Sequence, residues 1–305
     1  MTSPSRTISS QNKRQFRFGT AALPYLLLFP TVLFVTVFTL WPTIRVVYES
    51  LFLNNQAVKT PQFNGLDNYA ALANDPSFHD VLFNTFAYVA ITVPISVFLA
   101  LVLALVLNRK FRGLGLYRLA FFYPTVLPMI SAATIWYFMY TPGYGLINVF
   151  LSNFGIPSQS FLGSAKLALG ALMVLGIWKQ TGYFMVFYLA GLQGLPHEVF
   201  EAADLDGAST IQTTRYHTLP LLMGTTLIVT TIAVINAFET GDQIYIMTGG
   251  GPVNSTSMLL FNLLQTLFSF LDVGKASAMS VILIAILLIF TVLNFIYTER
   301  RTTYE

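Results

Sequence analysis

Residues 194–220 read GLPHEVFEAADLDGASTIQTTRYHTLP and separate two long apolar runs of the chain. The segment is unusually acidic, because Glu198, Glu201, Asp204 and Asp206 stand close together while no acidic residue occurs between Asp80 and Glu198. A long polar insert between two membrane-length segments is typical of a functional element. The alternative interpretation is a solvated loop that only joins the two runs.

The local chemistry of this segment predicts two short helices in a hairpin. Pro196 fits the first turn of the first helix, and Gly207 can end that helix in a left-handed conformation. Ser209 is a suitable N-cap for the second helix, which Pro220 closes. Three residues of the first helix are predicted to share one face: Val199, Phe200 and Ala203.

The composition indicates an integral membrane protein. Hydrophobic residues make up 55% of the chain and charged residues 10%, whereas a soluble domain carries about 25% charged residues. The net charge of +3 is too small and too dispersed to indicate a nucleic-acid partner. The chain has no cysteine, which excludes disulfides, thiol nucleophiles and thiolate metal sites. The histidines lack metal-ligand spacing, so no metal site is expected.

Six apolar runs are long enough to cross a membrane, which needs roughly 20 residues each. We therefore expect an all-α integral membrane protein whose helical domain covers residues 21–298, with tails at 1–20 and 299–305. Pro124 and Pro128 interrupt the third run. The predicted spans are 21–44, 81–107, 117–140, 167–192, 221–238 and 276–297.

The distribution of Lys and Arg predicts the orientation of these spans. Eleven basic residues fall in the two tails, in the connection after the second span and in the segment 194–220, against four in the other connections. Both termini and the hairpin are therefore expected in the cytoplasm. The outer connections would then be 47–80, 141–166 and 239–275, and they offer a docking surface for a soluble partner.

The spacing within 194–220 resembles the EAA loop of binding-protein-dependent ABC import permeases. That pattern is EAA, three residues, Gly, nine residues, Ile, one residue, then Leu-Pro, and His217 is the one departure from it. Further resemblance lies at 178–180 (WKQ), 192–196 (LQGLP) and 249–253 (GGGPV), which are similar to the subfamily importing sugars and glycerol phosphates. The resemblance assigns coupling to an ATPase subunit to these residues: Glu201, Ala202, Ala203, Asp206, Gly207, Leu219 and Pro220.

The resemblance implies a type I ABC importer permease fold with six transmembrane helices in a prokaryotic inner membrane. It also implies three kinds of protein partner: a pair of cytoplasmic ATPase subunits, a second homologous permease subunit and an extracytoplasmic solute-binding protein. ATP and Mg would be bound by the ATPase subunits, so this chain is expected to need no cofactor of its own and to be no enzyme. The solute would be a sugar, or alternatively a glycerol phosphate or glycerophosphodiester.

Lys179 is the charged residue nearest the middle of a predicted span, where a charge costs about 2.5–3.5 kcal/mol on insertion scales. One interpretation is that Lys179 lines the translocation path, and the other is a structural ion pair or snorkelling to an interface. A polar cluster at the end of the fifth span could contact a hydroxylated solute or could be an ordinary wet helix end. The candidate path residues are Lys179, Gln180, Tyr183, Asn236, Glu239 and Asp242.

Two other function classes remain as alternatives. A stand-alone secondary transporter or channel is favoured only by Lys179, and intramembrane carboxylates are sparse. An intramembrane enzyme would need paired catalytic groups at membrane depth. The stretch 249–252 (GGGP) lacks the ending of a phosphate-binding P-loop and is better explained as a turn.

Overall fold

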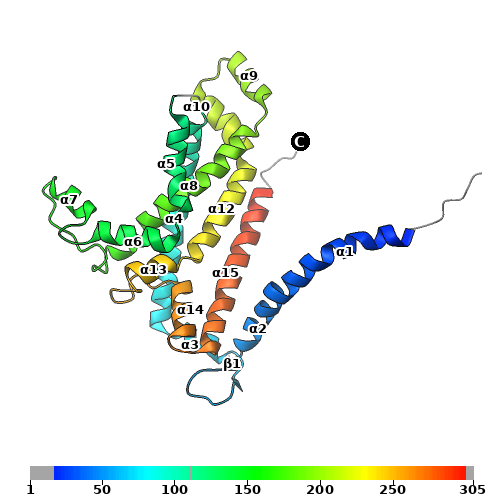
Figure 1. The fold of residues 1–305 in the computed structure, drawn as a ribbon, viewed down its shortest axis with the longest axis vertical. Helices are drawn as coiled ribbons and strands as arrows, with labels where there is room; N and C mark the ends of the chain where they lie inside the picture. Colours follow the sequence, from blue (N-terminus) through cyan, green and yellow to red (C-terminus); the bar gives the residue numbers. More distant parts are fainter. Residues whose placement is uncertain (1–16, 110–111, 300–305) are drawn as a thin grey trace, which may run out of the picture. The chain divides into compact units, whose positions relative to one another are not determined.

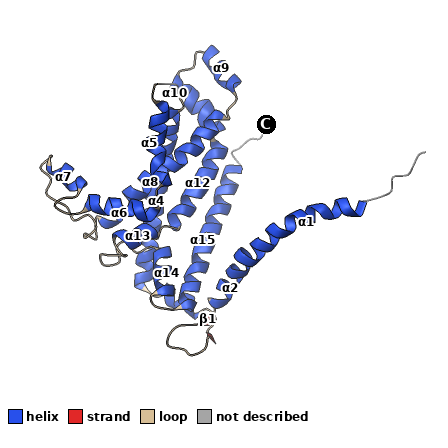
Figure 2. Ribbon diagram, viewed as in Figure 1, coloured by secondary structure: helices blue, strands red, loops and turns tan. Residues whose placement is uncertain are grey.

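The computed structural model describes residues 17–109 and 112–299, which are mostly helical (Figures 1 and 2). The chain divides after Tyr48 into two compact units. The first unit is a single helical stretch built from α1 (Arg17–Val35), the π-turn η1 (Thr36–Leu40) and α2 (Trp41–Glu49).

The second unit begins at Glu49 and contains all other elements. Its long helices are α4 (Pro76–Leu107), α8 (Ala168–Gln193), α12 (Met223–Phe238) and α15 (Val273–Glu299). The shorter elements are β1 (Phe52–Leu53), β2 (Gln62–Phe63), α3 (Asp67–Ala73), α5 (Leu114–Val126), α6 (Met129–Tyr140), α7 (Leu146–Ser152), α9 (His197–Leu205), α10 (Thr210–Thr213), η2 (Thr214–Thr218), α11 (Leu219–Leu221), α13 (Asp242–Met247) and α14 (Leu259–Phe268).

Helix α8 lies at the centre of this unit because three of its glycines let neighbouring helices approach closely. A Cβ at Gly176 would lie 2.1 Å from the Tyr88 hydroxyl of α4, and one at Gly182 would lie 2.0 Å from the Phe121 carbonyl of α5. A Cβ at Gly191 would lie 2.6 Å from Thr225 Oγ1 of α12. Small residues at helix contacts are how membrane helices pack tightly. The core around them includes the fully buried Leu172, Leu175, Phe184, Met185 and Tyr188.

Four described helical segments are long and apolar enough to cross a membrane, and a bent pair makes a fifth. The four are Pro24–Glu49, Pro76–Leu107, Met223–Met247 and Val273–Ile296. Helix α8 is not among them, and it carries the polar run Lys179-Gln180-Thr181 in its middle.

The predicted third span is broken in two. Helices α5 and α6 meet at an angle of 102° between Val126 and Met129. The two prolines explain the break, since Pro128 lacks an amide proton and biases the residue before it away from the helical region. Leu127 is accordingly extended, with φ −67° and ψ 132°.

The ends of α4 and α15 are tied together opposite α9 and α10 in the view of Figure 1. Asp75 caps α4 by accepting a hydrogen bond from the Ser77 amide at 3.0 Å, and it forms a 3.2 Å ion pair with Lys275 of α15. Burial alone would raise the pKa of Asp75. The hydrogen bonds from Lys275 and the Ser77 amide and the charge of Lys275 together lower it by more, so the pKa of Asp75 lies below its ordinary value. The two helices are therefore joined by a charged contact at this end.

The segment 249–257 forms a turn held by α4, as predicted for its Gly-rich start. Gly249 and Gly250 have φ values of 58° and 85°. Asn84 of α4 donates hydrogen bonds to the carbonyls of Asn254 (3.0 Å) and Ser257 (3.2 Å). Left-handed conformations suit glycine, so the turn follows from the sequence, whereas its anchor on α4 does not.

Candidate functional site

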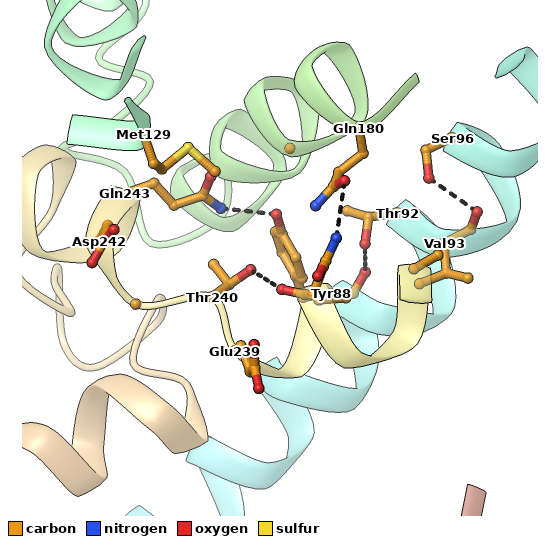
Figure 3. Close-up of a pocket in the computed structure, with 15 residues that line it drawn as sticks. Tyr88, Thr92, Val93, Ser96, Met129, Gln180, Glu239, Thr240, Asp242 and Gln243 are labelled. Carbon is orange, nitrogen blue, oxygen red and sulfur yellow. Dashed lines mark hydrogen bonds between the residues drawn. The ribbon is translucent and has the colours of Figure 1, made fainter. Parts of the chain in front are cut away.

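A cavity of about 220 Å³ lies where α4, α8, α12 and α13 meet, with Met129 of α6 at one side (Figure 3). It exists because α12 ends at Phe238 and α13 begins only at Asp242, which leaves a short non-helical break in the chain. Its polar lining comes from all four helices and the break: Tyr88, Thr92, Ser96, Gln180, Asn236, Glu239, Thr240, Asp242 and Gln243.

Tyr88 and Gln243 form a buried pair at the back of the cavity. The Gln243 amide nitrogen donates a 2.8 Å hydrogen bond to the Tyr88 hydroxyl (Figure 3). The two side chains are 2% and 0% exposed. The other amide atom, Gln243 Oε1, is buried and accepts no hydrogen bond from any described residue. A buried acceptor without a partner is uncommon in native proteins and marks a place where a ligand or water can bind.

Four of the six predicted path residues line this cavity. Asn236 of α12 donates a 3.4 Å hydrogen bond to Gln180 Oε1 of α8, so these two half-buried amides face each other across it. Glu239 and Asp242 are exposed at its rim. The structure thus brings together residues that the sequence placed on two separate spans.

Lys179 does not line the cavity. Its ammonium donates hydrogen bonds to the carbonyl of Pro124, at 3.0 Å, and to the carbonyl of Leu127. These carbonyls lie at the break between α5 and α6, where helical partners are lost. These contacts are structural, but the partners are backbone carbonyls and not the carboxylate of the ion pair that the sequence suggested.

Tyr183 also lies outside the cavity lining. Its ring packs against Phe184 and Phe187, with ring centroids 5.3 and 5.1 Å apart. This aromatic cluster belongs to α8 itself.

Sequence reasoning missed the polar residues of α4 and Gln243. Tyr88, Thr92 and Ser96 recur every fourth residue within an otherwise apolar helix, and this spacing places them on one face. That stripe is a signal that could have been found. Gln243 carried no such signal, because its partner Tyr88 lies 155 residues away in the chain.

The segment 194–220 forms the helices α9 and α10 at the end of the second unit opposite α14 and the strands (Figure 1). Gly207 has φ 73° and ends α9 in the left-handed conformation that the sequence predicts. The amides of Gly207 and Ala208 donate to the carbonyls of Asp204 (3.1 Å) and Ala203 (3.0 Å), which is the Schellman pattern of helix ends. Pro196 is the N-cap of α9, one position before the predicted first turn.

Ser209 caps α10 through a reciprocal pair of hydrogen bonds. The backbone N–H of Gln212 donates to Ser209 Oγ at 3.4 Å, while the backbone N–H of Ser209 donates to the side-chain oxygen Gln212 Oε1 at 2.7 Å. This capping box satisfies two backbone donors at the helix start. Because both helix ends facing the turn are closed by local hydrogen bonds, the connection between α9 and α10 has a defined geometry.

The hairpin has one face turned inward and an exposed face. Ala203 is buried and Val199 and Phe200 are half-buried, which confirms the predicted shared face. Leu205 and Ile211 are 89% and 79% exposed. The remaining predicted coupling residues are also exposed: Glu201, Ala202, Asp206, Gly207, Leu219 and Pro220. An acidic surface with exposed apolar side chains and small residues is suited to contact another protein.

His217, the departure from the family pattern, is half-buried within η2. Three residues later the helix reaches Pro220, which has no backbone N–H to donate to the carbonyl four positions earlier. The wider π-turn, in which the Leu219 amide donates to the Thr214 carbonyl, precedes this proline. The departure at His217 therefore coincides with a local change of helix type and leaves the two caps of the turn intact.

A model of the family described as "Binding-protein-dependent transport system inner membrane component" matches residues 69–301. The chain is 35% identical to the sulfoquinovosyl glycerol transport system permease protein of Agrobacterium fabrum, over 93% of this chain and 94% of that protein. It is 32% identical to the sn-glycerol-3-phosphate permease protein of the same organism, over 94% and 98%. It is also 32% identical to the trehalose/maltose permease protein of Thermococcus litoralis, over 91% and 94%.

Solved structures show a similar fold. A bacterial ABC transporter involved in the import of the acidic polysaccharide alginate matches with a TM-score of 0.82 and 20% identity, covering 94% of this chain and 100% of that chain. The same kind of transporter in complex with an alginate pentasaccharide-bound periplasmic protein matches with a TM-score of 0.80 and 19% identity, covering 92% and 96%.

Proposed function

Because this chain belongs to the family of binding-protein-dependent transport system inner membrane components, we infer that it is the transmembrane permease subunit of an ATP-driven importer. The solute is a sugar or sugar-like molecule delivered by an extracytoplasmic binding protein. The alternative solute, by the same mechanism, is a glycerol phosphate or glycerophosphodiester. The names of the relatives cover both kinds of solute.

The exposed hairpin of α9 and α10 is the observation that carries this proposal. Its acidic and apolar surface lies at the end of the two helices α8 and α12, which also line the cavity. A partner that moves the hairpin would therefore act on the cavity walls through two continuous elements. The proposed partner is a pair of ATPase subunits that bind ATP and Mg, while this chain itself is not catalytic.

We further propose six transmembrane helices with both termini and the hairpin in the cytoplasm of a prokaryotic cell. The six are the four apolar segments, the bent pair α5–α6 counted as one span, and α8. The basic residues of the tails and of the connection after α4 support this orientation. A second, homologous permease subunit with its own hairpin would complete the translocation path, and membrane lipid surrounds both.

Transport would proceed by alternating access. ATP binding brings the ATPase subunits together, the hairpins follow, and the cavity opens toward the loaded binding protein. The free energy of ATP can enter this chain only through contacts at the hairpin that differ between the two states. Gln180, Asn236, Glu239 and Asp242 would lie on the path because they line the cavity.

A stand-alone secondary transporter has lost its main support. Lys179 was the residue that favoured it, and the Lys179 ammonium binds backbone carbonyls at the α5–α6 break. We therefore do not propose that function.

The test is uptake and ATPase activity of the assembled transporter carrying Glu201→Lys. Charge reversal at this exposed position should abolish the contact with the ATPase subunits, so that they no longer co-purify and uptake falls to background. Asp80→Lys is the matched control, since Asp80 is also exposed but lies on the first turns of α4, far from the hairpin in the chain. Normal uptake by the Glu201→Lys variant would overturn the proposal.

A further inference from the structure

We propose that the cavity binds a neutral, hydroxyl-rich solute and discriminates against phosphorylated or sulfonated ones, with Gln243 Oε1 accepting a hydrogen bond from one solute hydroxyl. The inference rests on the proposed function, since it concerns the solute of the same translocation path. Similarity to relatives leaves the charge of the solute open, because their names include a glycerol phosphate as well as the neutral trehalose and maltose. The residues that line the cavity favour a neutral solute over a charged one.

The first argument is charge. The described lining contains two carboxylates, Glu239 and Asp242, and no Lys, Arg or His. The nearest cation in the sequence, Lys179, is engaged by the carbonyls of Pro124 and Leu127. Phosphate groups are bound in proteins mainly by Arg, Lys and backbone N–H groups. The start of α13 offers little to an anion, because Asp242 already places a negative charge in its first turn.

The second argument is the direction of the hydrogen bonds in the wall. Thr92 and Ser96 donate their hydroxyl protons to the carbonyls of Tyr88 (2.7 Å) and Val93 (3.1 Å). Thr240 donates in the same way to the carbonyl of Asn236 at 3.2 Å. Because their protons are used in this way, Thr92 and Ser96 can offer only lone pairs to the cavity, while Thr240 also interacts with the Tyr88 hydroxyl. Acceptors are complementary to the O–H groups of a sugar or polyol and repel phosphate oxygens.

The third argument is the orientation of Gln243. Its amide nitrogen is used on the Tyr88 hydroxyl at 2.8 Å, and Gly176 leaves the space that this hydroxyl occupies. The amide is thereby fixed, and Oε1 remains a buried acceptor with no partner among the described residues. Leaving such a group unsatisfied costs free energy, which a solute hydroxyl would recover. Neutral donors for solute oxygens are available from the amides of Gln180 and Asn236.

The size of the cavity agrees with a small solute. Its volume of about 220 Å³ lies below the roughly 300 Å³ at which pockets for drug-sized ligands begin. A monosaccharide, a small polyol or one unit of a longer sugar is the corresponding class.

The experiment measures binding to the purified complex of both permease subunits and the ATPase subunits by saturation-transfer NMR. The probes are matched pairs: glycerol against sn-glycerol 3-phosphate, and glucose against glucose 6-phosphate, with mannitol and trehalose as further neutral probes. We expect saturable binding of at least one neutral probe and binding at least tenfold weaker for the phosphorylated member of its pair. Equal or tighter binding of a phosphorylated probe, or no binding of any neutral probe, overturns the inference.

Variants test the residues. Gln243→Met should weaken binding of the neutral probe about tenfold, while Tyr88→Phe, which keeps Oε1 of Gln243, should weaken that binding less. Unchanged binding by Gln243→Met overturns the role of this acceptor. Glu239→Lys changes an exposed rim residue, so it should fold, and it should strengthen binding of sn-glycerol 3-phosphate at least fivefold. Asp80→Lys makes the same charge change outside the cavity and should not strengthen binding of sn-glycerol 3-phosphate. An unaltered preference in Glu239→Lys contradicts the charge argument.

The outcomes separate this inference from the proposed function. If the complex assembles and its ATPase activity responds to Glu201→Lys while the solute preference is wrong, only the inference fails. If the subunits do not assemble at all, the proposed function fails.

Discussion

Lys179 shows how one half-buried cation can serve structure in a membrane helix. Its ammonium meets two carbonyls that the α5–α6 break deprives of helical partners. Hydrogen bonds to a charged group contribute about 1.5–3 kcal/mol each. Such contacts are a sufficient reason for a lysine at this depth without any contact to the solute.

We therefore predict that Lys179→Met lowers the thermal stability of the complex, by an amount equivalent to about 1.5–3 kcal/mol, because both carbonyls lose their donor. The Michaelis constant for uptake should change little. Lys179→Arg retains donors and should recover part of the stability. The measurement is the melting temperature together with uptake kinetics. A large rise in the Michaelis constant at unchanged melting temperature would show that Lys179 contacts the solute.

Gly207 gives a second prediction for a single residue. An added Cβ there meets no atom within 4 Å, so only the backbone conformation at φ 73° opposes substitution. Non-glycine residues pay roughly 1–2 kcal/mol in this region, and Asn is the most tolerant of them. Gly207→Val should therefore distort the turn and uncouple ATPase activity from uptake, whereas Gly207→Asn should keep most coupling. Equal activity of the two variants would show that the left-handed turn is unimportant.

Among single residues, the sequence predicted those whose environment is local. Gly207 and Ser209 act on amides within a few positions, and their caps were predictable for that reason. The contacts of Lys179 and Gln243 join residues 52 and 155 positions apart, and no local pattern carries such information. The candidate site was accordingly found in part, from its α8 and α12 side.

At the scale of elements, the predicted third span, which the sequence shows to be interrupted by two prolines, is two helices at 102°. The prolines marked the place of the bend but could not give its angle, because the angle depends on packing against α8. Gly182 permits that packing through its close approach to the Phe121 carbonyl.

The contact between α4 and α15 gives a prediction about pH. The pKa of Asp75 is lowered in the folded protein, so its charge stabilises the fold above the ordinary carboxyl pKa, and this contribution is lost as the pH falls through the folded value. Asp75→Asn keeps an N-cap but removes the charge. The melting temperature of the wild type should exceed that of Asp75→Asn at neutral pH, and the difference should vanish in acid.

The exposure of the ion pair limits the size of this effect. Both partners are about one-third exposed, so the difference should correspond to at most about 1 kcal/mol. Lys275→Met serves as the matched variant, since it removes the other charge. If the difference between wild type and Asp75→Asn persisted unchanged in acid, the charge would not be its cause.

At the scale of the whole molecule, composition was enough to predict a helical membrane protein, and the family membership agrees with it. The number of spans was harder to predict. Helix α8 lies at the centre of the second unit but has a polar middle, and α5–α6 is long enough to be one span but is broken in two. Hydropathy measures neither the glycine contacts of α8 nor the angle between two helices.

The proposed topology is open to a direct test, because the chain has no natural cysteine. Single cysteines can be placed at Asp206, an exposed residue on the hairpin, and at Asn55, a half-buried residue near β1. In intact cells, a membrane-impermeant maleimide should label the Asn55→Cys variant only, and permeabilised cells should show both. Labelling of Asp206→Cys in intact cells would place the hairpin outside and contradict coupling to a cytoplasmic ATPase.

The π-turn η2 has a consequence for how motion would pass along the chain. The π-turn closes its hydrogen bond over five residues where an α-helix closes it over four. It therefore amounts to one inserted residue, and each residue of an α-helix advances about 100° around its axis. The residues of α10 are thus rotated by that angle relative to a regular helix running back from α11. The direction in which α10 meets the turn at Gly207 is therefore set by helical phase as well as by sequence, and tightening η2 by one residue would aim that turn elsewhere without altering a single side chain on it.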